Sequence, residues 1–91
     1  MVTRVVISRN AERDLKKVPS YIYQKYLYWV DLITDIGLQE ARKFKGFHDE
    51  PLFGMRKGQR SVRLSKSYRA IYIENNDLMF IYVIEVNKHD Y

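Results

Sequence analysis

The chain has 91 residues, a formal net charge of +5 at pH 7, and a hydrophobic fraction of 46%. This length and composition exclude an unfolded tail, so residues 1–91 are predicted to form a single small domain. The sequence has no cysteine and two histidines, which excludes a disulfide framework and a thiolate metal site, and no cofactor is expected.

The first half of the chain has the pattern of one strand followed by helices. Residues 4–8 are rich in β-branched side chains and are predicted to form a short strand. Ser8 or Asn10 can cap a short helix, and a longer amphipathic helix is predicted from 20 to 36, ending at Gly37. Its apolar positions, spaced three or four apart, are Ile22, Tyr26, Trp29, Ile33 and Ile36.

The second half is predicted to add helical turns at 38–44, a connector at 48–55, and then three strands. The strands are expected near residues 59–64, 68–74 and 78–86. Hairpin turns at Ser65–Ser67 and Asn75–Asn76 would separate them, and the last strand, apolar on both faces, should lie inside the sheet. The predicted fold class is α+β: an N-terminal strand, two to three helices, and a three-stranded antiparallel meander with the helices packed on one face.

The most unusual part of the sequence is an acid-free basic segment between residues 51 and 73. It contains six Lys and Arg side chains and no Asp or Glu. Such a segment favours a polyanionic partner, and nucleic acid is the first class to consider. The alternative is an ordinary solvated basic face. The residues expected to bind RNA phosphates outside a catalytic centre are Arg56, Lys57, Arg60 and Lys66.

The two remaining cations of this segment are predicted to face each other. With a three-residue loop at 65–67, Arg63 stands opposite Arg69, and like charges at that spacing destabilise a sheet. A bound phosphate would explain the pair, whereas the alternative is two arginines splayed over a solvated surface. With a two-residue turn after the next strand, Tyr82 would also lie opposite Arg69.

The sequence ends with three residues that can act on a bound phosphodiester. His89 is suited to proton transfer near neutral pH, Asp90 can orient it, and Tyr91 can stack on a base or donate its phenolic proton. A frayed chain end without a function is the alternative.

Two segments of the chain resemble the RelE/ParE superfamily of bacterial toxins, and most of all its RelE- and HigB-like messenger-RNA interferases. One is Arg60–Tyr72, with the motif Tyr-Arg-x-x-Tyr from Tyr68, and the other is Tyr82–Tyr91. The resemblance covers essentially the whole chain and implies a RelE-like fold. Ser61 departs from the pattern, because it replaces the first of two active-site lysines of RelE, and the general base is therefore open.

The resemblance also implies catalytic roles for individual residues. Arg69 matches a strand arginine credited with phosphate contact and transition-state stabilisation, and Arg63 stands where RelE toxins have a catalytic lysine. His89 falls at a basic position of RelE toxins, and Asp90-Tyr91 matches an Asp-Tyr pair of HigB toxins. His89 and Asp90 are expected to transfer protons, with either of them as the base, and no metal is required.

The function implied is that of a toxin of a type II toxin–antitoxin system. Such a toxin is an endoribonuclease that enters the ribosomal A site, cleaves the bound messenger RNA and inhibits translation. The partners implied are a cognate antitoxin, the ribosome and messenger RNA, with operator DNA reached through the antitoxin complex. The alternatives are a ParE-like inhibitor of DNA gyrase that performs no chemistry and a degenerate toxin retained as a binding module.

A cytoplasmic protein without a membrane partner is expected. The sequence contains no run of about 18 apolar residues, and its first residues do not have the pattern of a signal peptide.

Overall fold

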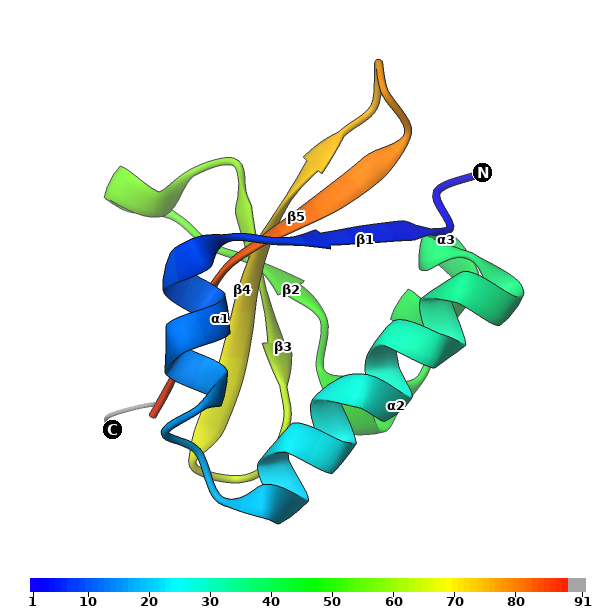
Figure 1. Ribbon diagram of the computed structural model, residues 1–91. Helices are drawn as coiled ribbons and strands as arrows, with labels where there is room; N and C mark the ends of the chain where they lie inside the picture. Colours follow the sequence, from blue (N-terminus) through cyan, green and yellow to red (C-terminus); the bar gives the residue numbers. More distant parts are fainter. Residues whose placement is uncertain (89–91) are drawn as a thin grey trace.

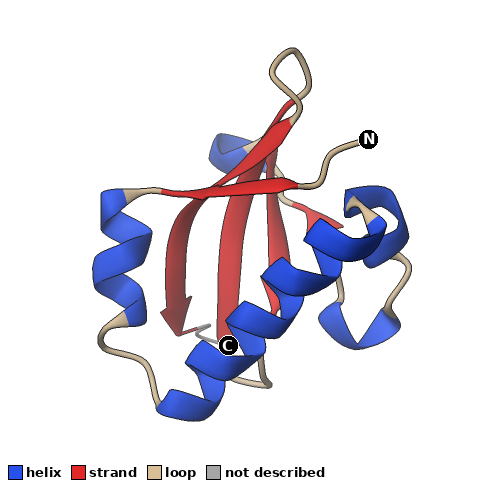
Figure 2. Cartoon of the chain, turned by 45° about the vertical axis from the view of Figure 1, so that its right-hand side comes forward, coloured by secondary structure: helices blue, strands red, loops and turns tan. Residues whose placement is uncertain are grey.

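The structure, a computed structural model, describes residues 1–88, which form a sheet with helices packed on one of its faces (Figure 1, Figure 2). The strands are β1 (Arg4–Ile7), β2 (Glu50–Pro51), β3 (Gln59–Arg63), β4 (Tyr68–Asn75) and β5 (Phe80–Lys88). Their order is β1-β5-β4-β3-β2, and all neighbours are antiparallel except β1 and β5, which are parallel. The predicted α+β class is confirmed, and the expected meander is extended by a strand at each edge.

The helix α1 (Arg9–Leu15) lies beside β5 where the pairing with β1 ends. Ser8 caps this helix, since its Oγ accepts a hydrogen bond from the Ala11 amide at 3.0 Å. Asp14 Oδ2 accepts a hydrogen bond from the Val86 amide at 3.0 Å, which satisfies a backbone donor of β5 that β1 does not reach. The start of the chain therefore closes one side of β5, an interior strand as predicted.

The long helix α2 (Ser20–Ile36) has the predicted bounds and packs its apolar stripe on the sheet. The ring centroids of Trp29 and of Tyr72 on β4 lie 5.5 Å apart. Gly37 follows with φ of 86°, a conformation that suits glycine, and α3 (Leu38–Arg42) begins directly after it. None of the helices formed by residues 1–88 is both long and apolar enough to cross a membrane.

The hairpin of β3 and β4 has the predicted register. The Leu64 amide donates to the Tyr68 carbonyl at 2.9 Å, which closes the short loop between the strands. Arg63 therefore pairs with Arg69, and Val62 pairs with Ala70.

The hairpin of β4 and β5 differs from the prediction. The two-residue turn expected at Asn75–Asn76 is wrong, because the turn spans residues 76–79. Ile73 pairs with Tyr82, and a β-bulge interrupts the pairing in the middle of the strands. A longer turn and a bulge each shift the register along the strand.

The connector expected at residues 48–55 contains an edge strand that the sequence analysis did not predict. β2 has two residues, and its second residue is a proline, so it shows no alternating pattern. It lies between the short 3-10 turns η1 (Lys45–Phe47) and η2 (Gly54–Arg56). Its pairing with β3 places Glu50 opposite Ser61.

The carboxylate of Asp49, directly before β2, is buried in an ionic network. Its side chain is 2% exposed, and it accepts hydrogen bonds from Arg60 Nε at 2.6 Å and from the Tyr72 hydroxyl at 2.5 Å. Burial and the Asp49 charge raise the pKa of the Tyr72 hydroxyl, so it remains a donor. Arg42 of α3 donates to the Tyr72 oxygen at 3.2 Å and also pairs with Glu74. These bonds fix β2 against the sheet and α3, because a buried charge that loses its partners costs several kcal/mol.

Removing the Tyr72 hydroxyl tests this network. Tyr72→Phe should lower the free energy of unfolding by about 1.5–3 kcal/mol, since the hydroxyl donates to a buried charged group. Tyr21→Phe, at an exposed position of α2, is the matched control and should change it by less than about 0.5 kcal/mol. Urea unfolding at pH 7 measures both, and equal midpoints for the two variants would contradict the assignment.

Candidate functional site

The two faces of the sheet have different chemistry because side chains alternate along β3 and β4. Val62, Ala70 and Tyr72 are buried against the helices. Arg63 and Arg69 project from the opposite face, which we call the open face because α2 lies on the other side of the sheet (Figure 2). The prediction that these two arginines share one face is confirmed.

A compact loop closes the hairpin whose two strands carry the arginines. Ser65 Oγ accepts hydrogen bonds from the amides of Ser67 and Tyr68, both at 3.1 Å. The Ser65 side chain therefore satisfies two backbone amides of the loop that a carbonyl would otherwise have to accept. It leaves Arg63 exposed and Arg69 partly exposed.

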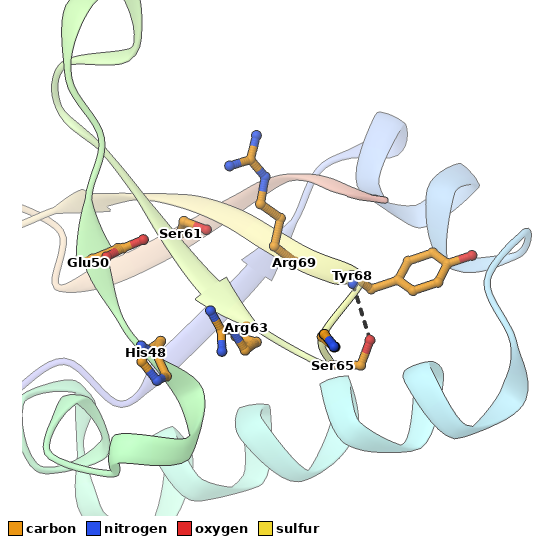
Figure 3. A pocket seen from close by; sticks show the side chains of 8 residues that line it. His48, Glu50, Ser61, Arg63, Ser65, Tyr68 and Arg69 are labelled. Atoms are coloured by element: carbon orange, nitrogen blue, oxygen red, sulfur yellow. Dashed lines mark hydrogen bonds between the residues drawn. The ribbon is translucent and has the colours of Figure 1, made fainter. Parts of the chain in front are cut away.

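A polar pocket lies beside this loop, and we call it the β3–β4 pocket (Figure 3). Its lining residues are His48, Glu50, Ser61, Arg63, Ser65, Lys66, Tyr68 and Arg69. They come from β2, β3, β4, the loop between β3 and β4, and the residue that follows η1. Within residues 1–88, no group of three or more His, Cys, Asp or Glu side chains is placed to hold a metal ion.

Two of the pocket residues, Glu50 and His48, were not among the site residues predicted from the sequence. Glu50 is the one carboxylate among the described residues that line the pocket, and it projects on the side of Ser61 because the two residues pair. Both side chains are exposed and can exchange protons with a bound molecule. The local sequence gave no signal for them, because their placement depends on β2.

Arg69 is connected to a chain of polar side chains across the open face. Its Nε donates to Asn87 Oδ1 at 3.4 Å, and Asn87 Nδ2 donates to Glu85 Oε1 at 2.9 Å. Arg56 reaches over from the loop after β2 and pairs with Glu85 Oε2 at 2.8 Å and Gln59 Oε1 at 2.8 Å. The hydrogen bond from Arg56 lowers the pKa of the Glu85 carboxyl and raises that of the Arg56 guanidinium. Arg69 is thereby oriented, and the Arg56–Glu85 ion pair anchors the loop.

The six basic residues of the acid-free segment do not form one surface. Arg60 lies three positions before Arg63 on the same strand, and an odd spacing places it on the opposite, helix-packed face. There its Nε pairs with Asp49 Oδ1 at 2.6 Å. Arg60 therefore does not lie with Arg63 and Arg69 on the open face, and its expected contact with RNA phosphates stays a prediction. Lys57 and Lys66 are exposed, and Lys66 lines the β3–β4 pocket.

The predicted partner of Arg69 across the sheet is also corrected. Arg69 pairs with Asn87, and Tyr82 pairs with Ile73 further along β4. The physical reason is the longer turn and the bulge between β4 and β5, which displace Tyr82 along the strand.

The predicted residues His89, Asp90 and Tyr91 lie outside the described residues. Lys88, which precedes His89 in the sequence, pairs with Tyr68, one of the residues that line the β3–β4 pocket.

Neither a protein-family model nor a curated protein sequence matches this chain. Solved structures do match over nearly the full length. A chain of the Escherichia coli DinJ-YafQ toxin-antitoxin complex is 18% identical with a TM-score of 0.75, and the match covers 98% of this chain and 94% of that one.

Two further matches are of the same kind. A chain of the archaeal RelE-RelB complex from Pyrococcus horikoshii is 23% identical with a TM-score of 0.73, covering 97% of this chain and 96% of that one. The YoeB/ParE toxin from Agrobacterium tumefaciens is 20% identical with a TM-score of 0.68, covering 96% and 99%. The protein therefore has the fold of RelE/ParE-type toxins, which confirms the fold that the sequence resemblance implied.

The Arg56–Glu85 ion pair gives a pH dependence with a definite sign. Because the folded pKa of Glu85 lies below its unfolded value, its stabilisation is present above the ordinary pKa of about 4.3 and is lost as the pH falls through the lowered value. Glu85→Gln should therefore destabilise the fold by up to about 1 kcal/mol at pH 7, and by progressively less below about pH 4. Urea unfolding over this pH range measures the difference, with Glu12→Gln, exposed on α1, as the control. A Glu85→Gln effect that does not change with pH would contradict the assignment.

Proposed function

We propose that the protein is the toxin of a type II toxin–antitoxin system and a metal-independent endoribonuclease that cleaves messenger RNA in the ribosomal A site. The observation that carries the proposal is the β3–β4 pocket, whose lining includes Arg63, Arg69 and the carboxylate-bearing Glu50. Paired cations favour a bound phosphate, and a nearby carboxylate can accept a proton from its neighbour. The toxin fold of the solved structures supports the same conclusion.

The reaction proposed needs no group beyond those of the protein and the RNA. The ribose 2′-oxygen loses its proton to a base and attacks the adjacent phosphorus, and the bond from phosphorus to the 5′-oxygen breaks. The 5′-oxygen then takes a proton from an acid, which leaves a 2′,3′-cyclic phosphate and a 5′-hydroxyl. Arg63 and Arg69 stabilise the negative charge that gathers on the phosphoryl oxygens between these steps.

The proton-transfer groups come from two parts of the chain. We assign the base to Glu50, which lies in the pocket as a carboxylate on the edge strand β2. The acid is then His89, with Asp90 orienting its imidazole and Tyr91 stacking on a base of the RNA. His48, also in the pocket, is the second candidate for the acid. Lys57, Lys66 and, through the loop after β2, Arg56 supply further positive charge for RNA phosphates.

The partners proposed are the ribosome with its messenger RNA and a cognate antitoxin. A cationic nuclease acting in the cytoplasm would damage its own host without an inhibitor, and an acidic antitoxin segment would complement the pocket. Complexes of related fold with an antitoxin support this proposal. Operator DNA would be bound through the antitoxin complex.

One experiment distinguishes the proposed nuclease from the alternative, an inhibitor of DNA gyrase that catalyses no reaction. The purified protein is incubated with ribosomes programmed with a defined messenger, and in parallel with DNA gyrase and supercoiled DNA. Cleavage of the messenger in the A-site codon with unaffected gyrase is expected. Inhibition of gyrase with an intact messenger would contradict the proposal.

The two pocket arginines are expected to act mainly in the transition state. Arg69→Ala and Arg63→Ala should each lower the rate of messenger cleavage by about 100- to 1,000-fold, as for the loss of a preorganised charge-stabilising donor. Arg13→Ala removes an exposed arginine of α1 and is the matched control, with an expected change below about threefold. Single-turnover cleavage on programmed ribosomes measures the rates, and full toxicity of the Arg69→Ala variant in cells at wild-type expression would refute the role.

The carboxylate of Glu50 is expected to affect catalysis and not stability. Glu50→Gln should lower the cleavage rate by about 100- to 10,000-fold, the range for a lost general base. Since Glu50 is exposed, the free energy of unfolding of the Glu50→Gln variant should stay within about 0.5 kcal/mol of that of wild type. Glu12→Gln is the control for an exposed carboxylate outside the pocket. Wild-type cleavage by Glu50→Gln would assign the base to His89 or Asp90 instead.

A further inference from the structure

The loop that joins β2 to β3 exposes two large apolar side chains. Phe53 is 82% exposed, and Met55 in η2 is fully exposed. The loop, residues 52–58, contains no acidic residue and also carries Arg56 and Lys57. A folded protein gains no stability from an exposed phenyl ring, so Phe53 in one loop with the exposed cation of Lys57 points to a partner that is both apolar and anionic.

The loop is held in place rather than extended into solvent at random. At its base the Leu52 amide donates to the Gln59 carbonyl at 2.9 Å. At its far side Arg56 pairs with Glu85 on β5 at 2.8 Å, across the open face. Figure 1 and Figure 2 show η2 on the side of the sheet away from α2, which is the side of Arg63 and Arg69. The loop that carries Phe53 is therefore anchored on the same side of the sheet as Arg63 and Arg69.

The distance along the chain links this loop to the pocket. Glu50 lines the pocket, and Phe53 follows it by three residues. Three residues of extended chain span at most about 10 Å, which corresponds to about three stacked nucleotides at 3.4 Å each. A nucleic acid strand with one phosphate in the pocket would therefore reach Phe53 within a few nucleotides.

We propose that Phe53 is a stacking platform for one unpaired base of the RNA, a few nucleotides from the phosphate held in the β3–β4 pocket. This inference rests on the proposed function and adds a binding residue to it. Aromatic stacking beside cations is the way in which single-stranded nucleic acid is commonly held, and a base offers the apolar face while its phosphate offers the negative charge. A duplex hides its bases and should not engage the ring.

The experiment measures equilibrium binding of a short single-stranded RNA whose 2′-oxygens are methylated, so that it cannot be cleaved. Wild-type protein is compared with Phe53→Leu, which keeps an apolar side chain but removes the ring, and with Phe53→Trp, which keeps an aromatic one. Met55→Ala is the matched control for an exposed apolar residue of the same loop. Phe53→Leu should bind about 5- to 150-fold more weakly, while Phe53→Trp and Met55→Ala should bind within about threefold of wild type.

A second arm locates the base. Abasic nucleotides are placed one at a time along the RNA, so that each removes a base and keeps its phosphate. Wild type should lose affinity at one position near the pocket-bound phosphate, and Phe53→Leu should not lose affinity again at that position. Single-stranded RNA should quench the fluorescence of the tryptophan added in Phe53→Trp, and an RNA duplex should not.

The outcomes separate this inference from the proposed function. Binding that depends on Phe53, without any cleavage of messenger on programmed ribosomes, would support the stacking platform and refute the nuclease. Equal RNA binding by wild type and Phe53→Leu, or no detectable binding by wild type, would overturn the platform. If Phe53→Leu weakened only the complex with a protein partner such as the antitoxin, the loop would be a protein-docking site and the proposal would be wrong.

Discussion

The register of β3 against β4 is the constraint on which the rest of the site depends. Because side chains alternate along a strand, one register places Val62 and Ala70 in the core and Arg63 opposite Arg69 on the open face. A shift by one residue would bury both guanidinium groups and expose the core. The hydrophobic effect that fixes the fold therefore also places two arginines at facing positions of adjacent strands. Like charges at facing positions are unfavourable until an anion binds near them.

A second constraint brings the carboxylate to these cations. β2 is too short to be held by sheet hydrogen bonds alone. The buried side chain of Asp49 adds further hydrogen bonds, which it accepts from Arg60 and Tyr72. The residue after Asp49 is Glu50, which thereby lies in the pocket. Beyond β2 the Arg56–Glu85 pair anchors the loop that exposes Phe53. A core network, a candidate catalytic group and a candidate RNA contact thus follow one another between Asp49 and Phe53.

The sequence predicted the parts of the fold that are set by local spacing. The bounds of α2 follow from its apolar stripe, and the β3–β4 register follows from a short loop that allows few alternatives. The parts set by long-range contacts were missed or wrong. Nothing local indicates that Arg60 is held by Asp49 or that Glu50 pairs with Ser61, and a β-bulge cannot be read from the apolar run of β5. Glu50 was missed as a candidate for this reason, while the shared face of Arg63 and Arg69 was predicted because it depends on one hairpin.

An anion site formed by Arg63 and Arg69 at a cost in stability would show in the free energy of unfolding of Arg63→Gln. Arg63 is exposed, so the substitution removes charge without opening the core. At low salt the account predicts that Arg63→Gln is more stable than wild type by about 0.2–1 kcal/mol, the range for a relieved like-charge pair. Adding the methylated single-stranded RNA should reverse the order, because a ligand stabilises the protein that binds it more tightly. An Arg63→Gln variant that is less stable than wild type without RNA, or that gains as much stability from the RNA as wild type does, would contradict the account.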